Sequence, residues 1–279
     1  MEPGGTRAVL TLAACVDRRP RERGASLRQA LVSSQAVAGD RGFDDGYRRW
    51  RASRRHAALL SQGMPPQIEP FSFVPWDGLQ LLARLAGTGA GRTLVDLGCG
   101  RGGPGLWLAQ HLRADPIGAD GSAVAVSDAR ERKRLFPGTA SARFLVTDVT
   151  STGLAGRCAD VVVCIDVLQV LEDHSALLGE TARLLKPGGR AVITTWEGRG
   201  TAPGRFPRDL RRLIIDAGLR PATLIEQPAW LERQLRIYQS TAANHGDPAL
   251  ADLAQEGRRW QSWHTLTRRV VIAARHHTR

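Results

Sequence analysis

An acidic residue followed by glycines at nearly alternate positions stands out near the middle of the chain. Asp96 lies within an apolar run and is followed by four turn residues, Gly98, Cys99, Gly100 and Gly102. Glycine has no Cβ, so it takes positive φ and lets a ligand approach the backbone closely. The amphipathic run that follows predicts a helix, whose first N–H groups are free to bind a polar ligand. The stretch therefore predicts a ligand-binding turn at the carboxyl end of a buried parallel strand.

Two classes of nucleotide-binding protein use such a turn. Gly98, Gly100 and Gly103 fit the dinucleotide pattern G-x-G-x-x-G, which is a weak signal by itself. Together with Asp96 and Gly102, the stretch also fits D-x-G-x-G-x-G, which resembles the first motif of the class I S-adenosylmethionine (SAM) methyltransferases. The two ligands differ in charge. A carboxylate beside the turn disfavours a pyrophosphate but favours the ammonium at the methionine end of SAM.

Acidic residues also follow the next two predicted strands. Asp120 ends a short strand, where a carboxylate can accept both hydroxyls of a ribose, in NAD and in SAM alike. Ser122 is expected to cap the next helix and to lie at the same site. The resemblance to the SAM methyltransferases implies that Asp148 and Val149, after the third strand, flank the adenine, with the carboxylate accepting from its exocyclic amine.

Each of these carboxylates also has a simpler interpretation. Asp96 could cap its turn, Asp120 could interact with the start of the next helix, and Asp148 could bond to its own loop. Their joint occurrence favours a binding site, because the carboxyl ends of parallel strands meet at one edge of a sheet. Residues 184–190 add to the resemblance, since they are similar to the family's L-x-P-G-G turn. The lone strand that ends the chain is expected to pair antiparallel, as in the family.

The segment after the fourth predicted strand departs from the family. Many members have a histidine there that serves as a base, but Val170 stands at this position. Asp166, a few residues earlier, is expected to hold the methionine amine or to contact the acceptor, unless it only caps a helix or bonds its loop. The other candidate bases are polar residues of the second half of the chain, Glu197, His245 and His264.

Aromatic residues outside the alternating strands and helices are candidates for an acceptor pocket. They are Tyr47, Trp50, Trp76 and Trp230. Flat apolar side chains suit a small organic ligand, but they equally suit the packing of helices against a sheet. Both interpretations remain open from the sequence.

From Arg92 onward, short apolar strands alternate with helices across short connections. This pattern predicts an α/β fold with a doubly wound, mostly parallel sheet. The resemblance implies the seven-stranded, Rossmann-like methyltransferase sheet. We expect a disordered or poorly packed tail over residues 1–25, an N-terminal helical cap over 26–90 and a SAM-binding domain over 91–279. A helical insert is expected within that domain, at about 228–263.

The composition argues against several other functions. The formal charge is +12, and all but two of the 39 basic residues are arginine, but they are scattered along the chain. We therefore expect no nucleic-acid partner, and an RNA or DNA methyltransferase stays only an alternative. The four cysteines have no metal-ligand spacing, and no apolar run is long enough to span a bilayer. We expect a cytoplasmic protein that uses no metal and has no membrane partner.

The resemblance implies methyl transfer from SAM to a small organic acceptor, by in-line displacement at the sulfonium methyl. We expect O-methylation of a secondary metabolite. One alternative is an enzyme of the same fold that has lost methyl transfer and catalyses a cyclisation or rearrangement. Another is an NAD(P)-dependent oxidoreductase. The sequence leaves the identity of the acceptor and the oligomeric state open.

Overall fold

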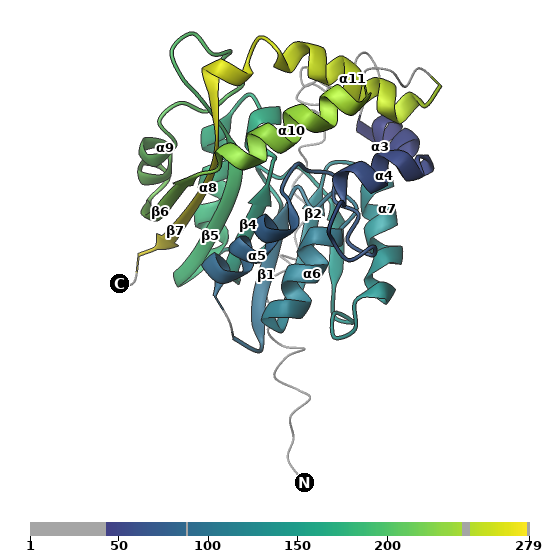
Figure 1. Ribbon diagram of the computed structural model, residues 1–279. Helices are drawn as coiled ribbons and strands as arrows, with labels where there is room; N and C mark the ends of the chain where they lie inside the picture. Colours follow the sequence, from purple (N-terminus) through teal and green to yellow (C-terminus); the bar gives the residue numbers. More distant parts are fainter. Residues whose placement is uncertain (1–42, 88, 242–245, 278–279) are drawn as a thin grey trace.

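A seven-stranded sheet forms the centre of the computed structural model, which describes residues 43–87, 89–241 and 246–277 (Figure 1). The strand order is β3-β2-β1-β4-β5-β7-β6. The strands are β1 (Arg92–Leu97), β2 (Ala114–Asp120), β3 (Arg143–Val146), β4 (Ala159–Ile165), β5 (Leu185–Gly198), β6 (Leu219–Glu226) and β7 (Thr267–His276). β7 runs antiparallel to both of its neighbours, β5 and β6, whereas the pairs among β1 to β5 are parallel. The predicted doubly wound α/β fold of the SAM methyltransferases is confirmed.

The central strands are buried on both faces. In β4, residues Val161 to Cys164 are each at most 1% exposed, so no position has to be polar and the strand is apolar without alternation. The parallel register pairs Asp96 of β1 with Gly118 of β2 and with Val163 of β4. The carboxyl ends of these strands therefore lie at the same edge of the sheet.

Helices cover both faces of the sheet. One face is packed by α5 (Trp76–Ala86), α6 (Gly103–Leu112) and α7 (Ala123–Arg132), and the other by α8 (His174–Leu184) and α9 (Leu210–Asp216). Short 3-10 turns complete the connections: η2 (Lys133–Leu135), η3 (Leu168–Val170) and η4 (His264–Leu266). The core consequently lies in two apolar layers, one on each side of the sheet.

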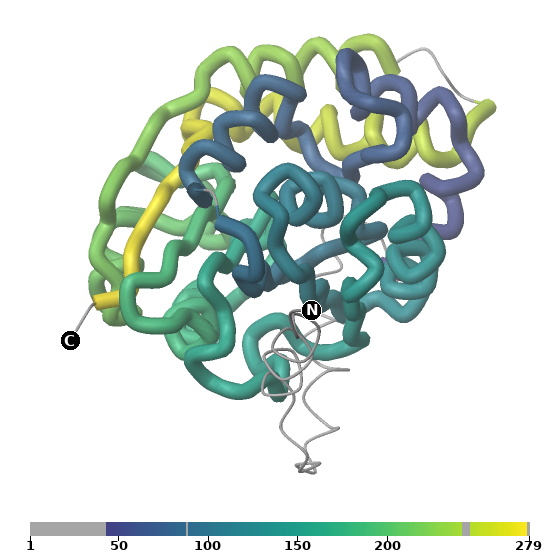
Figure 2. The backbone as a smooth tube through the Cα atoms, turned by 90° about the horizontal axis from the view of Figure 1, so that it is seen from below, coloured from purple at the N-terminus to yellow at the C-terminus, as the bar shows by residue number. Residues whose placement is uncertain are grey.

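Four further helices lie over the carboxyl edge of the parallel strands, at the top of Figure 1. They are α3 (Phe43–Ala52), α4 (Arg54–Leu60), α10 (Pro228–Thr241) and α11 (Pro248–Trp260). Both views show α3 and α4 beside α11, although these segments are far apart in the sequence (Figures 1 and 2). We call these four helices the top layer. It brings both parts of the chain over the sheet edge that carries the acidic residues.

Polar side chains join the two halves of the top layer. Arg49 and Trp50 of α3 donate to the same carboxylate oxygen of Asp252 in α11, at 2.8 and 3.2 Å. Ser53 donates to Asp247 at 2.6 Å, and that carboxylate also accepts from the first N–H groups of α11. These partly buried contacts fix α3 and α4 relative to α11.

The structure refines several expected boundaries. The sequence pattern predicts one helix over 43–60, but Ser53 interrupts it, because its hydroxyl accepts from the N–H of His56 and caps α4. α10 and α11 lie within residues 228–263, where an insert is expected, and the insert itself stays a prediction. The tail expected over 1–25 lies outside the described residues. α5, expected within the cap, packs on the sheet through Leu79 and Leu82, and the division into cap and domain stays a prediction.

The start of α6 gives a testable constraint on packing. A Cβ on Gly103 would lie 1.6 Å from the backbone oxygen of Ile68, which cannot move as a side chain can. We expect Gly103→Ala to lower the free energy of unfolding by about 1–3 kcal/mol, as overpacking does. Urea unfolding followed by circular dichroism measures this change.

A helical glycine in open space provides the matched control. A Cβ on Gly179 in α8 would meet no atom within 4 Å, so Gly179→Ala should raise stability by up to about 1 kcal/mol through helix propensity. Equal effects of the two substitutions would contradict the close packing at Gly103.

Candidate functional site

Three cavities adjoin along the carboxyl edge of the sheet, beneath the top layer, and Phe71 lines all of them. The wide cavity, of about 400 Å³, includes Asp120, Ser122, Asp148, Val149 and Asp166 in its lining. The glycine-turn cavity, of about 40 Å³, includes Asp96, Gly98, Cys99 and Gly100. The aromatic cavity, of about 60 Å³, is described below. Most of the predicted binding residues are thus brought together in one continuous region.

The glycine turn follows β1 and is tied to β2. The N–H groups of Gly98 and Cys99 both donate to the carbonyl oxygen of Ala119, at 2.8 and 3.0 Å. Gly98 has a φ of +74°, and a Cβ there would lie 2.2 Å from the side chain of Val167. Only glycine fits this approach between the turn and the loop after β4. Gly102 then caps α6 in the left-handed conformation.

Asp96 is 5% exposed at the end of β1 and lines the glycine-turn cavity. Burial, together with the charge of Asp120, raises the pKa of Asp96 to about 7. Within the described part of the chain, Asp96 forms no ion pair. A buried carboxylate without a counter-ion favours a cationic ligand, since a nearby positive charge stabilises the ionised form. Ser72 lines the same cavity, and its buried Oγ has no hydrogen-bond partner among the described residues.

Asp120 is oriented by two backbone groups. The N–H of Gly100 donates to one carboxylate oxygen at 2.8 Å and the N–H of Ser122 to the other at 2.9 Å. Burial raises the pKa of Asp120, although these N–H groups favour its ionised form. Ser122 has the expected capping role, because its Oγ accepts from the N–H of Ala125 at 3.1 Å and donates to Asp44 of α3. Asp120 and Ser122 both line the wide cavity.

Asp148 combines the two interpretations that the sequence left open. Its Oδ1 accepts from the backbone N–H and the hydroxyl of Thr150, at 2.8 and 2.7 Å, so the carboxylate does bond its own loop. Asp148 and the buried Val149 also line the wide cavity. The local bonds therefore hold the carboxylate at the wall of the cavity rather than removing it.

Asp166 lies between the wide and the aromatic cavities and has a buried counter-ion. Arg269 of β7, which is 0% exposed, pairs with it at 2.6 Å. The hydroxyl of Thr194 and the N–H of Phe73 also donate to this carboxylate, at 2.5 and 3.3 Å. Because Arg269 balances its charge, Asp166 attracts a ligand ammonium less than an unpaired carboxylate would. Its φ of +59° matches a position constrained by these contacts.

Glu197 and His264, two of the other candidate bases, are not part of the lining of the three cavities. Glu197 is 4% exposed, accepts from the N–H of Leu210 at 2.6 Å and pairs with Arg268. His264 is half-buried, and its ring bonds the carbonyl oxygen of Gln261. His245 lies outside the described residues. The structure thus places Glu197, near the end of β5, in an ion pair and His264, in η4, in a local hydrogen bond.

The four candidate aromatic residues fall into two groups. Tyr47 lines both the wide and the glycine-turn cavities, and burial raises its pKa so that the phenol stays neutral. Trp50 stacks on Phe71, with ring centroids 3.8 Å apart, and so supports the cavity wall from behind. Trp76 packs edge-on against Trp107, and Trp230 is buried in the core. The last two join helices rather than line a cavity.

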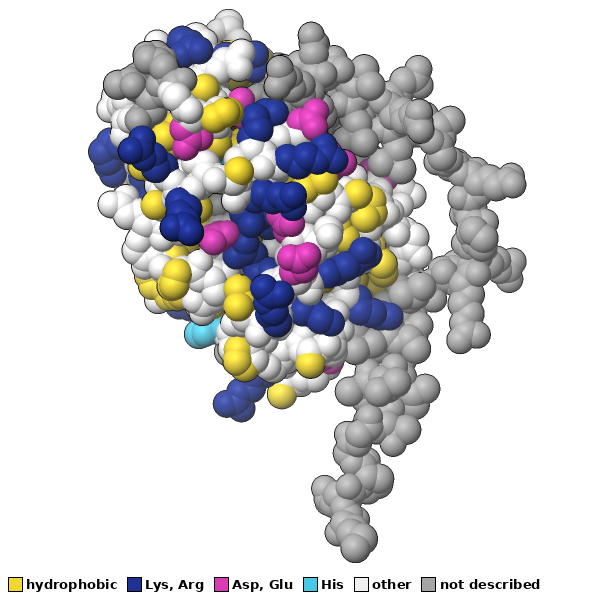
Figure 3. All heavy atoms as spheres, turned by 90° about the vertical axis from the view of Figure 1, so that its right-hand side faces the viewer, with side chains coloured by type: hydrophobic (Ala, Val, Ile, Leu, Met, Phe, Trp, Pro, Cys, Tyr) yellow, Lys and Arg dark blue, Asp and Glu magenta, His cyan; other side chains and the backbone are white. Residues whose placement is uncertain are grey.

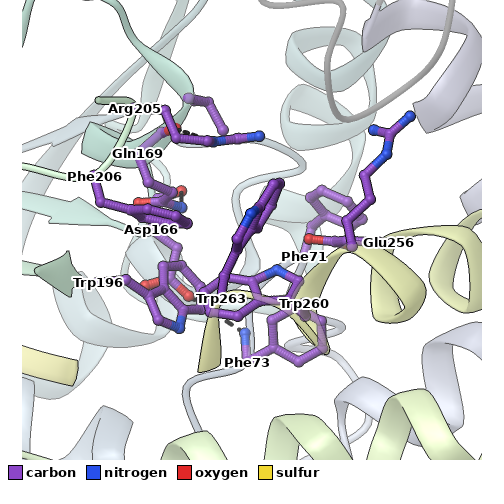
Figure 4. A pocket seen from close by; sticks show the side chains of 12 residues that line it. Phe71, Phe73, Asp166, Gln169, Trp196, Arg205, Phe206, Glu256, Trp260 and Trp263 are labelled. Carbon is purple, nitrogen blue, oxygen red and sulfur yellow. Dashed lines mark hydrogen bonds between the residues drawn. The ribbon is translucent and has the colours of Figure 1, made fainter. Parts of the chain in front are cut away.

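The aromatic cavity contains residues that the sequence patterns did not single out (Figure 4). Its lining is Phe71, Phe73, Asp166, Gln169, Val170, Trp196, Arg205, Phe206, Glu256, Arg259, Trp260 and Trp263. Trp260 and Trp263 lie in the segment where the sequence predicts an insert, but the lining comes from five separate segments of the chain. Burial raises the pKa of Glu256, and contacts with Tyr238 and Trp260 partly offset this effect. Figure 4 shows the aromatic side chains surrounding the cavity, with Arg205 along one side.

No helix of the described residues is long and apolar enough to cross a membrane. Over the same ranges, no three His, Cys, Asp or Glu side chains gather as metal ligands would.

Comparisons with known proteins agree with this geometry. A family model described as "Methyltransferase domain" matches residues 95–193. Methyltransferase GfsG of Streptomyces halstedii is 30% identical over 137 residues, which are 49% of this chain and 49% of that protein. The chain therefore spans about half the length of this curated relative.

Solved structures show the same fold. Phosphoethanolamine N-methyltransferase 2 of Haemonchus contortus aligns over 94% of this chain and 62% of its own, with a TM-score of 0.68 and 19% identity. The [4+2]-cyclase SpnF aligns over 72% of this chain and 82% of its own, with a TM-score of 0.58 and 21% identity. Residues 95–193 match a methyltransferase domain, and the sheet order and the fold of these solved structures agree with it: the chain has the fold of the class I SAM-dependent methyltransferases.

Proposed function

We propose that this protein transfers the methyl group of SAM to a small organic acceptor. One observation carries the proposal: Asp96, Asp120 and Asp148, at three successive strand ends, line two adjoining cavities, which share Phe71 with a third. The wide cavity, of about 400 Å³, suits the adenosine. The smaller glycine-turn cavity suits the methionine end, and the aromatic cavity suits the acceptor.

The roles of the individual residues follow from their charges. Asp120 accepts the two ribose hydroxyls, and Asp148 and Val149 flank the adenine. Asp96 favours the methionine ammonium, because a buried carboxylate gains a counter-ion there. We assign the methionine carboxylate to the hydroxyl of Ser72, which is buried in the same cavity and has no other partner among the described residues.

The bound cofactor supplies an electrophilic methyl group on a sulfonium. The chain's own contribution is to align the acceptor behind that methyl and to exclude water, effects that supply about 7–11 kcal/mol in well-oriented reactions. Phe71 fits this role because it lines the cavities on both sides of the junction. We propose an oxygen nucleophile of a secondary metabolite as the methylated group.

The cyclisation alternative has one structural observation in its favour. Val170 occupies the loop position where many relatives have a histidine, and none of the three cavities has a histidine among the described residues that line it. A reaction that needs only a shaped, dry cavity would not require one. Methyl transfer and cyclisation would use the same SAM site, and they differ in whether the methyl group of SAM is transferred.

Titration calorimetry with SAM and, separately, with NADH tests the cofactor assignment. We expect SAM to bind and NADH not to bind. Binding of NADH alone would overturn the proposal in favour of an oxidoreductase. Formation of S-adenosylhomocysteine with an acceptor then distinguishes methyl transfer from cyclisation. Tight SAM binding without turnover for any acceptor would favour the cyclase.

Asp120→Asn tests the ribose contact. The amide keeps the shape but replaces charge-assisted hydrogen bonds, each of which contributes about 1.5–3 kcal/mol. We expect SAM affinity to fall by about 10- to 100-fold in calorimetry.

The matched control is Asp216→Asn, the same change at an exposed carboxylate of α9 that pairs only with Arg212. Its affinity should equal that of the wild type. Thermal unfolding of both variants checks that the turn at Gly100 remains folded. Undiminished affinity in folded Asp120→Asn would refute the ribose assignment.

The raised pKa of Asp96 predicts a pH dependence of binding. The carboxyl of the free protein gains a proton as the pH falls through about 7, and the neutral form no longer attracts an ammonium. We expect SAM affinity to fall between about pH 7 and about pH 5.5, where the SAM amine is mostly protonated. Asp96→Asn should remove this slope. A wild-type affinity that is flat with pH would contradict the role of Asp96.

The same shift has a consequence for stability. A raised pKa in the folded state means that the ionised carboxyl destabilises the unliganded fold, so the stability that is fully present below about pH 4 is lost progressively as the pH rises from there to about 7. Unfolding of unliganded Asp96→Asn should therefore be less sensitive to pH than that of the wild type. Identical pH profiles would show that the buried carboxyl does not titrate in this range.

A further inference from the structure

The side chains around the aromatic cavity carry an excess of positive charge. Arg205 and Arg259 line it, and so do Asp166 and Glu256. Asp166 is already balanced by the buried Arg269. Glu256 is therefore the one acidic side chain in this lining that faces the two arginines. The cavity is net positive even when Glu256 is ionised, and burial raises the pKa of Glu256, which increases this excess.

Arg205 is the cation best placed to meet a ligand. Its guanidinium carbon lies 5.5 Å from the ring centre of Trp263 and 5.7 Å from that of Phe206. Its Nε donates to the backbone oxygen of Gln169 at 3.2 Å. No carboxylate of the described residues lies within ion-pair distance of it. Figure 4 shows the side chain reaching along the pocket toward Trp263.

Partial burial of this guanidinium has an electrostatic cost. Removal from water lowers the pKa of Arg205, which shows that the charged form is disfavoured there. A charge in such a place is normally paired. Among the described residues, Glu256 acts on Arg205 only from beyond ion-pair distance, so a bound anion would supply a direct partner. The planar fork of a guanidinium matches a carboxylate or a phosphate in two parallel hydrogen bonds.

The rest of the lining restricts the body of the ligand. Rings of Phe71, Phe73, Trp196 and Trp260 surround a space of about 60 Å³. Such walls favour a flat apolar group of about one ring, through offset and edge-on contacts. The same walls would suit an ammonium by cation–π attraction. The two arginines oppose that choice, because a second cation would be repelled.

We infer that the aromatic cavity takes a small aromatic acceptor that carries an anionic group, a carboxylate or a phosphate, bound by Arg205. This inference rests on the proposed methyl transfer and names the class of its acceptor. The ring lies within the aromatic walls, and the anionic group pairs with the guanidinium on the Phe206 side. A hydroxyl elsewhere on the ring is left free to face the methyl group. Its oxygen would form the new C–O bond as the C–S bond of the sulfonium breaks, S-adenosylhomocysteine would leave, and the hydroxyl proton would pass to solvent.

Binding of defined probes tests the inference without knowledge of the natural acceptor. The protein, saturated with S-adenosylhomocysteine, is titrated with 4-hydroxybenzoate, phenyl phosphate, neutral 4-hydroxybenzamide and cationic tyramine. Quenching of tryptophan fluorescence reports occupation. We expect at least one anionic probe to bind about tenfold tighter than the amide, as a charge-assisted pair would require. Comparison of the two anions distinguishes carboxylate from phosphate.

Variants then assign the effect to one residue. Arg205→Gln should abolish the preference for the anionic probe, and Arg205→Lys, which keeps the charge but not the fork, should retain part of it. The matched control is Arg211→Gln, at an exposed arginine of α9, and it should behave as the wild type. Retained S-adenosylhomocysteine binding shows that a variant is folded.

The outcomes separate this inference from the proposed function. If S-adenosylhomocysteine does not bind the wild type, the SAM assignment itself fails. If it binds but tyramine or the amide matches the anions, or no probe binds, the acceptor class is wrong while the SAM site stands. A preference that survives in Arg205→Gln would likewise overturn the role of Arg205. Should Arg205→Gln fail to fold, the wild type and Arg205→Lys still decide the question.

Discussion

Compensation of buried carboxylates is the constraint on which this site depends. Parallel strands deliver acidic side chains to one edge, where burial makes each ionised carboxyl costly unless it is paired. Asp166 has Arg269, Asp120 has two backbone N–H groups, and Asp148 has Thr150. Asp96 alone of these four has no such partner among the described residues, which is why burial moves its pKa to about 7. The arrangement leaves one uncompensated negative site, beside the cavity proposed for the methionine ammonium.

The top layer turns this edge into a closed site. Phe71, stacked on Trp50 of α3, reaches all three cavities, so one side chain separates the proposed cofactor and acceptor spaces. α3 is held to α11 through Asp252 and Asp247. Residues from both ends of the described chain therefore form the acceptor side together. Any shift of α3 would alter the cofactor and acceptor walls at once, because they share Phe71.

The chemistry of the site follows from what its walls contain. Aromatic rings and Asp166, whose charge Arg269 balances, line the junction, and the loop after β4 contributes Val170 to it. Such a lining supplies little general-base chemistry but much desolvation and positioning. An in-line displacement at a sulfonium needs chiefly these two effects. The absence of a histidine from the described walls is thus compatible with methyl transfer and consistent with a site that acts mainly by its shape.

The sequence by itself determined the alternating α/β pattern, the glycine turn, and the placing of Asp96, Asp120 and Asp148 at strand ends. Hydrophobic periodicity is a local property, and the carboxyl ends of parallel strands lie at one edge of a sheet. Tertiary structure decided which side chains face the cavities. It paired Asp166 with Arg269, which lies 103 residues away. It also placed Glu197 in an ion pair and the side chains of Trp76 and Trp230 in packing contacts. It also gathered the lining of the aromatic cavity from five segments. Contacts between distant segments have no local pattern, because they depend on how helices of the top layer pack across the sheet edge.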